Sequence, residues 1–476
     1  MRDPLMAAPA VPDSTFDLYA LRLGHDPALL HGDAEVVSYP PVPSIAAVRA
    51  LSAATLSQRR RRQQVYFGPS IAIRRTIGQG VHDRLEAAAF ADGQISPADE
   101  ERASRHFPFP TRILSIRQRE VPVDECWDLS VRGEHWGLDD RDDIINVVNI
   151  GTLRLAPGAI VAVRGNLLIL IVQRLICEGS GQLAILPTPF PVDPRTGPLH
   201  GPAGLPGRNG ADGARGAPAP TAATWLGPRL TAPVVPGAAD GRDGGDATAG
   251  CDGDRGRTGG ASKLAEITIG ELTGTLTLVA TAGRGGDGGD GGDGGDGGYG
   301  GHGADGQRTL SGIVPPGRGA YGGRGGDGGR GGRGGDGGIA SNIFVSLPPD
   351  QEGCLRVLSH PSAGGIGGRA GRGGDGSSGG ASGRAAGAPG IGNAPGVAGA
   401  DGARGADGAP GADGVAGRGG RARPAPPVFV NERPVEPMPG PAVVRPPQTM
   451  ASRDIRRGAA PAPGRDSRRQ ITAPTT

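Results

Sequence analysis

Glycine recurs at every third position over long stretches of this 476-residue chain. The stretches cover 201–216, 241–259 (where Ala247 replaces one glycine), 285–306, 319–337 and 396–420, with a looser one at 364–383. A period of three belongs to the polyproline II helix, which has no internal hydrogen bonds. Its backbone N–H and C=O groups must therefore pair with water or with neighbouring segments, and a glycine edge lets another backbone approach closely.

Three arrangements satisfy this period: a collagen triple helix, a single-chain bundle of polyglycine II helices, and a flexible linker. The stretches 285–307 and 317–338 contain no proline, and most of their triplets hold two glycines, which favours the bundle. A strict period argues against a linker. The last stretch carries Pro410 among GAD, GAR and GAP triplets, and there the bundle and the triple helix stay equally open.

The two proline-free stretches have matched lengths and are joined by the nine residues 308–316, so we predict that they lie antiparallel. Their non-glycine side chains would form two outward lines of complementary charge, which we take as a candidate binding face. It comprises Asp287, Asp290, Asp293, Asp296, Tyr299, His302, Tyr321, Arg324, Arg330 and Arg333. We expect inward glycines such as Gly291 and Gly328 to tolerate no side chain, and Asp293 to tolerate alanine.

Residues 143–190 form a series of short β-rich runs separated by turn residues. The unit of strand, turn, strand and glycine stretch recurs at 265–282 and 339–360, which indicates an internal repeat. The predicted fold class is mainly β and irregular. It combines a short-strand β-solenoid with bundled polyproline II or polyglycine II helices and a small α-containing N-terminal region. A sandwich sheet is the alternative.

Four regions follow from these patterns. Residues 1–142 are predicted to be a mixed helical adaptor, in which Ser44 caps a helix that runs into the four arginines 59–62, and further helices cover 82–90 and start near Ser96. Residues 143–200 are a solenoid-like stem, and 201–420 hold the glycine helices with the interleaved strand pairs. Residues 421–476 are a disordered tail rich in Pro and Arg. The arginine run is interpreted as a solvated face.

No motif carries convincing chemistry. The letters GSSGG at 376–380 fit a nucleophile elbow around Ser378 without its strand–turn–helix context. Carboxylates about 9 Å apart along one polyproline II helix cannot share a calcium ion. The cysteines Cys126, Cys177, Cys251 and Cys354 are scattered, so zinc is not expected. An acidic group before the first strand is interpreted as a polar turn rather than a metal site: Glu134, His135, Asp139, Asp140, Asp142 and Asp143. We therefore predict no catalytic, cofactor or metal site, and no enzyme.

Charge and hydropathy exclude further classes. A net charge of +2 gives no electrostatic reason to bind nucleic acid. The longest apolar run, 167–172, is far too short to span a membrane. The first residues lack the apolar region of a signal peptide, so we expect a soluble protein without Sec export, and a cell-surface or virion-like particle is compatible with this.

The triplets GADGARGADGAPGADG resemble those of bacterial collagen-like proteins. The run GGDGGDGGDGGYGGHG resembles the glycine-rich segments of polyglycine II proteins, namely phage tail-fibre tip adhesins and springtail-type antifreeze proteins. The resemblance is periodic and covers about 201–420. It implies a non-enzymatic structural or binding protein, such as an adhesin with a protein or glycan partner, present as a monomer bundle or a homotrimer. The alternatives are a collagen-like trimeric fibre, an ice-binding protein and a β-solenoid polysaccharide lyase.

Overall fold

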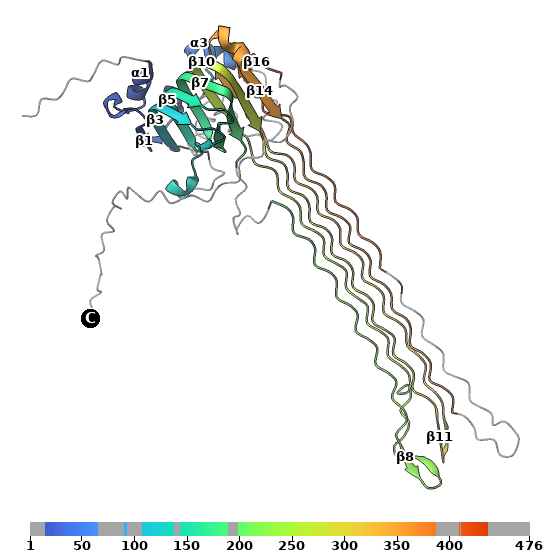
Figure 1. Ribbon diagram of the computed structural model, residues 1–476. Helices are drawn as coiled ribbons and strands as arrows, with labels where there is room; N and C mark the ends of the chain where they lie inside the picture. The colour runs from blue at the N-terminus through green and yellow to red at the C-terminus, as the bar shows by residue number, and fades with distance from the viewer. Residues whose placement is uncertain are drawn as a thin grey trace, which may run out of the picture. The chain divides into compact units, whose positions relative to one another are not determined.

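The computed structural model describes residues 15–64, 90–92, 107–137, 143–188, 199–386, 409 and 411–436. All of them belong to one compact unit, Met1–Pro439. This unit contains a large β-sheet with short helices at its N-terminal end, and the glycine stretches emerge from its strands (Figure 1).

The sheet has 12 strands and mixed direction. Its central strands run parallel, in the order β3 (Phe109–Val121), β5 (Ile145–Leu155), β7 (Leu167–Leu186), β10 (Ala265–Thr281), β13 (Ile343–Ser346) and β15 (Val428–Val430). Three shorter strands also pair in parallel, β4 (Cys126–Asp128) on β6 (Ile160–Arg164), β6 on β7, and β14 (Leu355–His360) on β10. Antiparallel strands lie at both edges: β1 (Glu35–Ser38) and β2 (Pro41–Val42) on β3, and β16 (Arg433–Pro434) on β15.

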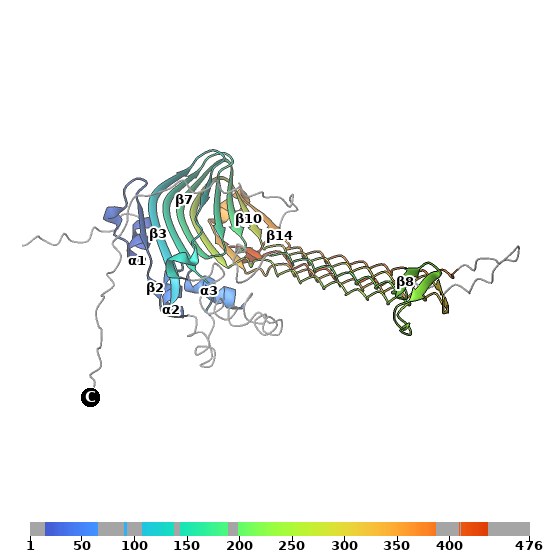
Figure 2. The ribbon, with the colours of Figure 1, turned by 90° about the horizontal axis from the view of Figure 1, so that it is seen from below.

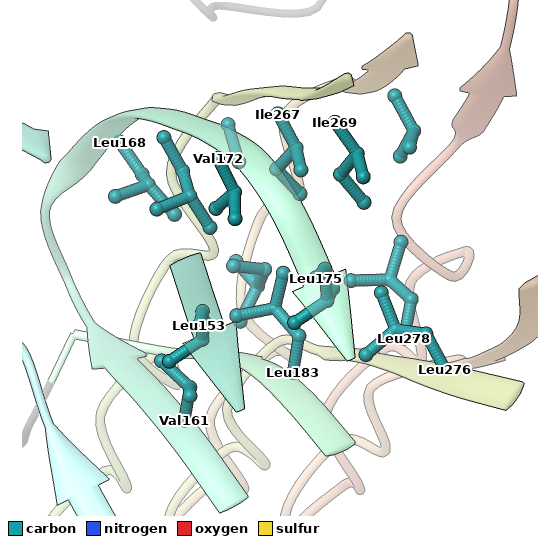
Figure 3. Close-up of a cluster of buried hydrophobic side chains, with 14 of the residues drawn as sticks. Leu153, Val161, Leu168, Val172, Leu175, Leu183, Ile267, Ile269, Leu276 and Leu278 are labelled. Carbon is teal, nitrogen blue, oxygen red and sulfur yellow. The ribbon is translucent and has the colours of Figure 1, made fainter. Parts of the chain in front are cut away.

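The long strands bend, so that their two halves enclose the main core (Figure 2). The first part of β7 pairs with β5, whereas its last residues pair with β6. Leu168 and Val172 from the first half of β7 and Leu175 and Leu183 from the second half belong to one buried cluster (Figure 3). Burying these branched side chains on both sides of the bend stabilises the curved sheet through the hydrophobic effect.

The predicted fold class is wrong. The segments expected to stack do pair, since β7 lies parallel beside β10, and β10 beside β13 and β14. However, the described residues form a mixed α/β domain around a 12-stranded mixed sheet, with no closed solenoid. The physical reason is that β7 and β10 are long strands that span the bend, and that after β7, β10 and β14 the chain continues into a glycine run instead of closing a coil.

The N-terminal helices differ in part from the expectation. Ser44 caps α2 (Ile45–Leu51) by accepting a hydrogen bond from the Ala47 N–H, as predicted. The helix then ends, and Thr55 caps a separate helix, α3 (Leu56–Arg62), so the single helix running into the arginines is wrong. The region also contains α1 (Thr15–Arg22), the 3₁₀ helices η1 (Pro27–Leu29) and η3 (Gly133–Trp136), and strand β3, while η4 (Pro349–Cys354) precedes β14. Of the helix expected at 82–90, the structure describes Phe90 alone, as helical, and the helix expected near Ser96 lies outside the described residues.

The glycine stretches form six extended runs within the described residues, which we call the glycine bundle. They are run 1 (201–216), run 2 (241–259), run 3 (283–306), run 4 (317–338), run 5 (363–384) and run 6 (409 and 411–421). The hairpin β8 (Thr221–Thr224) and β9 (Gly227–Leu230) connects runs 1 and 2. The hairpin β11 (Gln307–Thr309) and β12 (Gly312–Val314) connects runs 3 and 4.

Backbone hydrogen bonds fix how the runs are stacked. Consecutive runs lie antiparallel: Gly335 N–H donates to the Gly286 carbonyl and Gly332 N–H to the Gly289 carbonyl. The expected antiparallel arrangement of 285–307 and 317–338 is therefore present. Alternate runs lie parallel, as in the bonds from Gly201 N–H to the Asp287 carbonyl and from Gly204 N–H to the Asp290 carbonyl.

Each inner run bonds to four others, and residues 285–287 illustrate this. Gly285 N–H donates to Ala363 in run 5 at 2.9 Å, and Gly286 N–H to Arg257 in run 2 at 2.8 Å. The Gly286 carbonyl accepts from run 4 at 2.7 Å and the Asp287 carbonyl from run 1 at 2.8 Å. Each inner run thus contacts the two runs that precede it and the two that follow it in the chain. These contacts define two layers, with runs 1, 3 and 5 in one layer and runs 2, 4 and 6 in the other (Figures 1 and 2).

Position in the layers explains the composition of the runs. Inner runs 3 and 4 hold two glycines in most triplets and no proline, because two sides of each triplet face another backbone. Run 1 lies at the edge, has one glycine per triplet and accommodates Pro202 and Pro206. A proline cannot donate a hydrogen bond, so it is tolerated where no neighbour needs one. The collagen-like triplets of run 1 thus occur in a run that lies at the edge of the bundle.

The cysteines provide a first test of these layers. Burial raises the pKa of the Cys177 thiol on β7 to about 11, whereas Cys251 in run 2 is exposed. Since the thiolate is the reactive form, we expect Cys251 to react with a thiol reagent in the native protein and Cys177 to react only after unfolding. Mass spectrometry of pulse-labelled protein measures this. Equal labelling of both residues in the native state would contradict the described core.

Candidate functional site

The ten residues of the candidate binding face lie in both layers. Asp287, Asp290, Asp293, Asp296, Tyr299 and His302 belong to run 3, and Tyr321, Arg324, Arg330 and Arg333 to run 4. Since runs 3 and 4 are in different layers, the structure does not bring the acidic line and the arginine line together on one face. The ion pairs of run 4 instead follow the run, as between Arg324 and Asp327 at 3.0 Å.

The aspartates of run 3 have a structural role that the sequence analysis missed. The Oδ1 atoms of Asp287, Asp290 and Asp293 each accept a hydrogen bond, at 2.7 Å, from a backbone N–H of run 5. The donors are Ile366, Arg369 and Arg372, each 79 residues further along the chain. We call this series the aspartate ladder. It satisfies, in three triplets of run 5, an N–H that no backbone carbonyl accepts.

The opposite layer repeats the ladder. Asp243 and Asp246 in run 2 accept hydrogen bonds from the backbone N–H groups of Tyr321 and Arg324 in run 4, at 2.9 and 2.8 Å. The carbonyl of Tyr321 in turn accepts the Gly244 N–H at 2.9 Å. Tyr321 is therefore held at both backbone groups by run 2, the parallel neighbour that precedes run 4, and an aspartate of run 4 such as Asp327 can in turn hold run 6.

This finding corrects the expectation that Asp293 is dispensable. A hydrogen bond to a charged group contributes more than an exposed ion pair, but the ladder is open to water, so we expect Asp293→Ala to lower the free energy of unfolding by about 1 kcal/mol. Asp293→Asn keeps an oxygen acceptor at the same position and should lose less than half as much. Urea unfolding of the two variants measures the difference. Equal stability of Asp293→Ala and the parent chain would contradict the ladder.

The same kind of hydrogen bond, from a backbone N–H to an aspartate carboxylate, lowers the pKa of Asp336 near the end of run 4. Its Oδ1 accepts the Arg421 N–H at 3.0 Å. This hydrogen bond, together with the guanidinium groups of Arg333, Arg255 and Arg423, holds the pKa of Asp336 below its ordinary value. The carboxylate therefore stays ionised, and it stays an acceptor, down to lower pH than a free aspartate.

The two hairpins that connect the runs form a second surface, which we call the tip (217–238 and 307–316). The hairpins contact each other, since the Leu310 N–H donates to the Pro228 carbonyl at 2.8 Å. Trp225 is 92% exposed and Leu226 is 62% exposed, at the turn between β8 and β9. The sequence analysis did not single out this surface, although its signal was present in an apolar pair, Trp-Leu, at a position where turns carry polar residues.

Other motifs have ordinary surroundings. Ser378 lies in the extended run 5, where its carbonyl accepts the Gly300 N–H at 3.0 Å. Asp143 forms an ion pair with Lys263, the one lysine of the chain. Glu134 and His135 lie in η3, and Asp139, Asp140 and Asp142 are outside the described residues. Within the part of the chain that the structure describes, no group of three or more His, Cys, Asp or Glu side chains could hold a metal ion.

Comparison with known proteins gives no relative. No family model, curated protein or solved structure matches the chain. In the described parts of the chain, no helix has both the length and the apolar character needed to cross a membrane.

Proposed function

We propose that this chain is a non-enzymatic binding protein that presents a recognition tip on a rigid glycine bundle, in the manner of an adhesin. The observation that carries the proposal is Trp225, which is 92% exposed at the turn of a hairpin that ends two bundle runs. Large apolar side chains left in water at a protruding site are typical of interaction surfaces. Tryptophan is also among the residues most enriched at the energetic centres of interfaces.

The bundle is suited to hold such a tip away from the sheet. Its hydrogen bonds continue into the sheet, since Thr188 N–H donates to the Ala261 carbonyl and Ser262 pairs with Ala340 beside β10 and β13. Inner runs are bonded on four sides, so bending one run requires breaking bonds to several others. A stiff arm reduces the conformational entropy that the tip loses when it binds a partner.

The alternative functions have less support. A collagen-like trimer requires glycine N–H groups to pair between chains, whereas here the inner runs pair within one chain. Ice binding requires a flat face without strong charge, and the outer lines carry Asp and Arg. The role is proposed as non-enzymatic because Ser378, which fits the letters of a nucleophile motif, lies in an extended glycine run. The proposal leaves the chemical class of the partner open, and a protein or glycan is the class expected from the sequence.

Adhesion of protein-coated beads tests the proposal. Beads carrying the full chain are expected to adhere to bacterial cells or isolated cell envelopes, and the double variant Trp225→Ser, Leu226→Asn should lose most of this adhesion. Both residues have negative φ, so polar residues fit the turn. Leu205→Ser, which removes an apolar side chain 72% exposed on the bundle, is the matched control and should adhere normally. Adhesion that is absent, or that survives the tip variant, would overturn the proposal.

A further inference from the structure

The composition of the tip sets it apart from the bundle. Residues 217–238 and 307–316 contain no aspartate or glutamate, and their charged side chains are Arg229 and Arg308. Every bundle run described above, in contrast, contains or contacts aspartates. The exposed large apolar side chains of the tip are Trp225, Leu226, Val234, Val235, Leu310 and Ile313. The tip is thus an apolar surface with positive charge only.

Both hairpins of the tip use the same turn. Thr224-Trp225-Leu226-Gly227 and Thr309-Leu310-Ser311-Gly312 share a threonine and a glycine three residues apart. In each, the threonine hydroxyl donates to the glycine carbonyl, at 2.5 and 2.9 Å. Each glycine also has a positive φ, of 128° at Gly227 and 135° at Gly312, which favours glycine there.

Each turn is therefore closed by its first and last residues, and the side chains of Trp225, Leu226 and Leu310 take no part in closing it, whereas Ser311 lies 3.1 Å from the Thr309 hydroxyl. Leu310, at the same position as Trp225 in its own turn, is 53% exposed, and Ile313 beyond it is 51% exposed. Turns usually carry polar residues at their apex because these are the most solvated positions of a hairpin. Apolar residues at the apex of both hairpins indicate a partner that receives protruding apolar groups.

We propose that the tip binds an anionic lipid surface. This inference rests on the proposed function and names the partner. A lipid bilayer accepts protruding apolar side chains at its interface without a preformed groove, and the indole ring, apolar with one polar N–H, suits that interface. Anionic headgroups complement Arg229 and Arg308, and the absence of acidic residues in the tip removes repulsion.

Vesicle binding of the full chain tests the proposal. In a Trp127→Phe, Trp136→Phe background, Trp225 is the one remaining tryptophan and reports on the tip. With vesicles of phosphatidylglycerol and phosphatidylcholine, its emission should shift to the blue and be quenched by brominated acyl chains. In cosedimentation, the original chain should bind, and Trp225→Ser with Leu226→Asn should reduce the partition coefficient at least tenfold. Arg229→Gln with Arg308→Gln should remove the preference for phosphatidylglycerol over pure phosphatidylcholine. Leu205→Ser, on the bundle, should bind as the parent does.

The outcomes separate the partner from the proposed function. Vesicle binding that is lost in the tip variant supports the lipid partner. Absence of vesicle binding together with tip-dependent bead adhesion would overturn the lipid partner and leave a protein or glycan partner of the tip. Vesicle binding that survives the tip variant, or that lacks any preference for anionic lipid, would also overturn this inference.

Discussion

Gly328→Val is expected to unfold the glycine bundle. A Cβ atom at Gly328 would lie 2.2 Å from the Gly371 carbonyl oxygen of run 5, which is backbone held by its own hydrogen bonds. The Gly328 N–H also donates to the Ala412 carbonyl of run 6 at 2.8 Å, so moving run 4 away from run 5 disturbs run 6 as well. Because several runs must shift together, we expect a loss of on the order of 4–5 kcal/mol, as for the most damaging single substitutions. Circular dichroism melting measures the loss.

The matched control lies two residues away in the same run. The Arg330 backbone is bonded to run 2, but its side chain is exposed, so Arg330→Val introduces the same side chain into open space. We expect a change within about 0.5 kcal/mol. Gly291→Val, whose Cβ would meet the Gly329 carbonyl oxygen at 2.2 Å, should behave as Gly328→Val does. Equal tolerance at Gly328 and Arg330 would contradict the bundle, and melting that depends on protein concentration would indicate a trimer.

The pairing of the runs could be predicted because its cause is local. A three-residue period without proline forces the backbone to find partners, and a short connection between two equal stretches places them side by side. The layers could not be predicted, because the partner of Asp293 is an N–H group 79 residues away in another run. From the sequence alone, a carboxylate that accepts a hydrogen bond from a distant backbone N–H cannot be told apart from a carboxylate that is only solvated at the surface.

The solenoid prediction failed at particular glycines. Gly165 and Asn166 do separate two strands, as expected. Gly179, interpreted as a turn, has φ 95° but lies inside β7, where the strand continues and the partner changes from β5 to β6. Strand β3 was missed although Thr111, Ile113 and Ser115 share a buried face, because the helical patterns around it dominated the interpretation of residues 1–142.

The arginine run 59–62 shows the same limit of sequence reasoning. Four adjacent arginines on a helix look solvated, and Arg60 is indeed exposed beside Asp92. Arg62, however, is completely buried. Its Nη1 donates to Glu266 on β10 at 2.7 Å and its Nε to Glu432, between β15 and β16, at 2.9 Å. One side chain thus connects the N-terminal helices with the middle and the end of the sheet.

Arg62→Ala is expected to destabilise the sheet domain by about 3–5 kcal/mol, because it removes the buried cation that the carboxylates of Glu266 and Glu432 both contact. The guanidinium also lies 4.3 Å from the centre of the Phe344 ring, and that contact is lost as well. Arg60→Ala, on the same helix, is the matched control. Its ion pair is exposed, so the expected loss is about 0–1 kcal/mol. Denaturant unfolding of the two variants measures the difference, and equal losses would contradict the buried cluster.

The pH dependence of the Arg62→Ala loss distinguishes buried charge from lost packing. Burial raises the pKa of Glu432 above its ordinary value of 4.5, while Arg62 opposes this rise. Without Arg62 the pKa of Glu432 in the folded state should rise further. At pH values between the pKa of the unfolded chain and this raised pKa, the folded variant keeps a proton that the unfolded chain has already released. Stability of the variant relative to the parent should then improve as pH falls from 8 towards 5, because protonation removes the buried negative charge that Arg62 no longer offsets. A loss that is the same at pH 8 and pH 5 would mean that Arg62 acts through packing alone. Glu432→Gln in the Arg62→Ala background should restore part of the stability at pH 8.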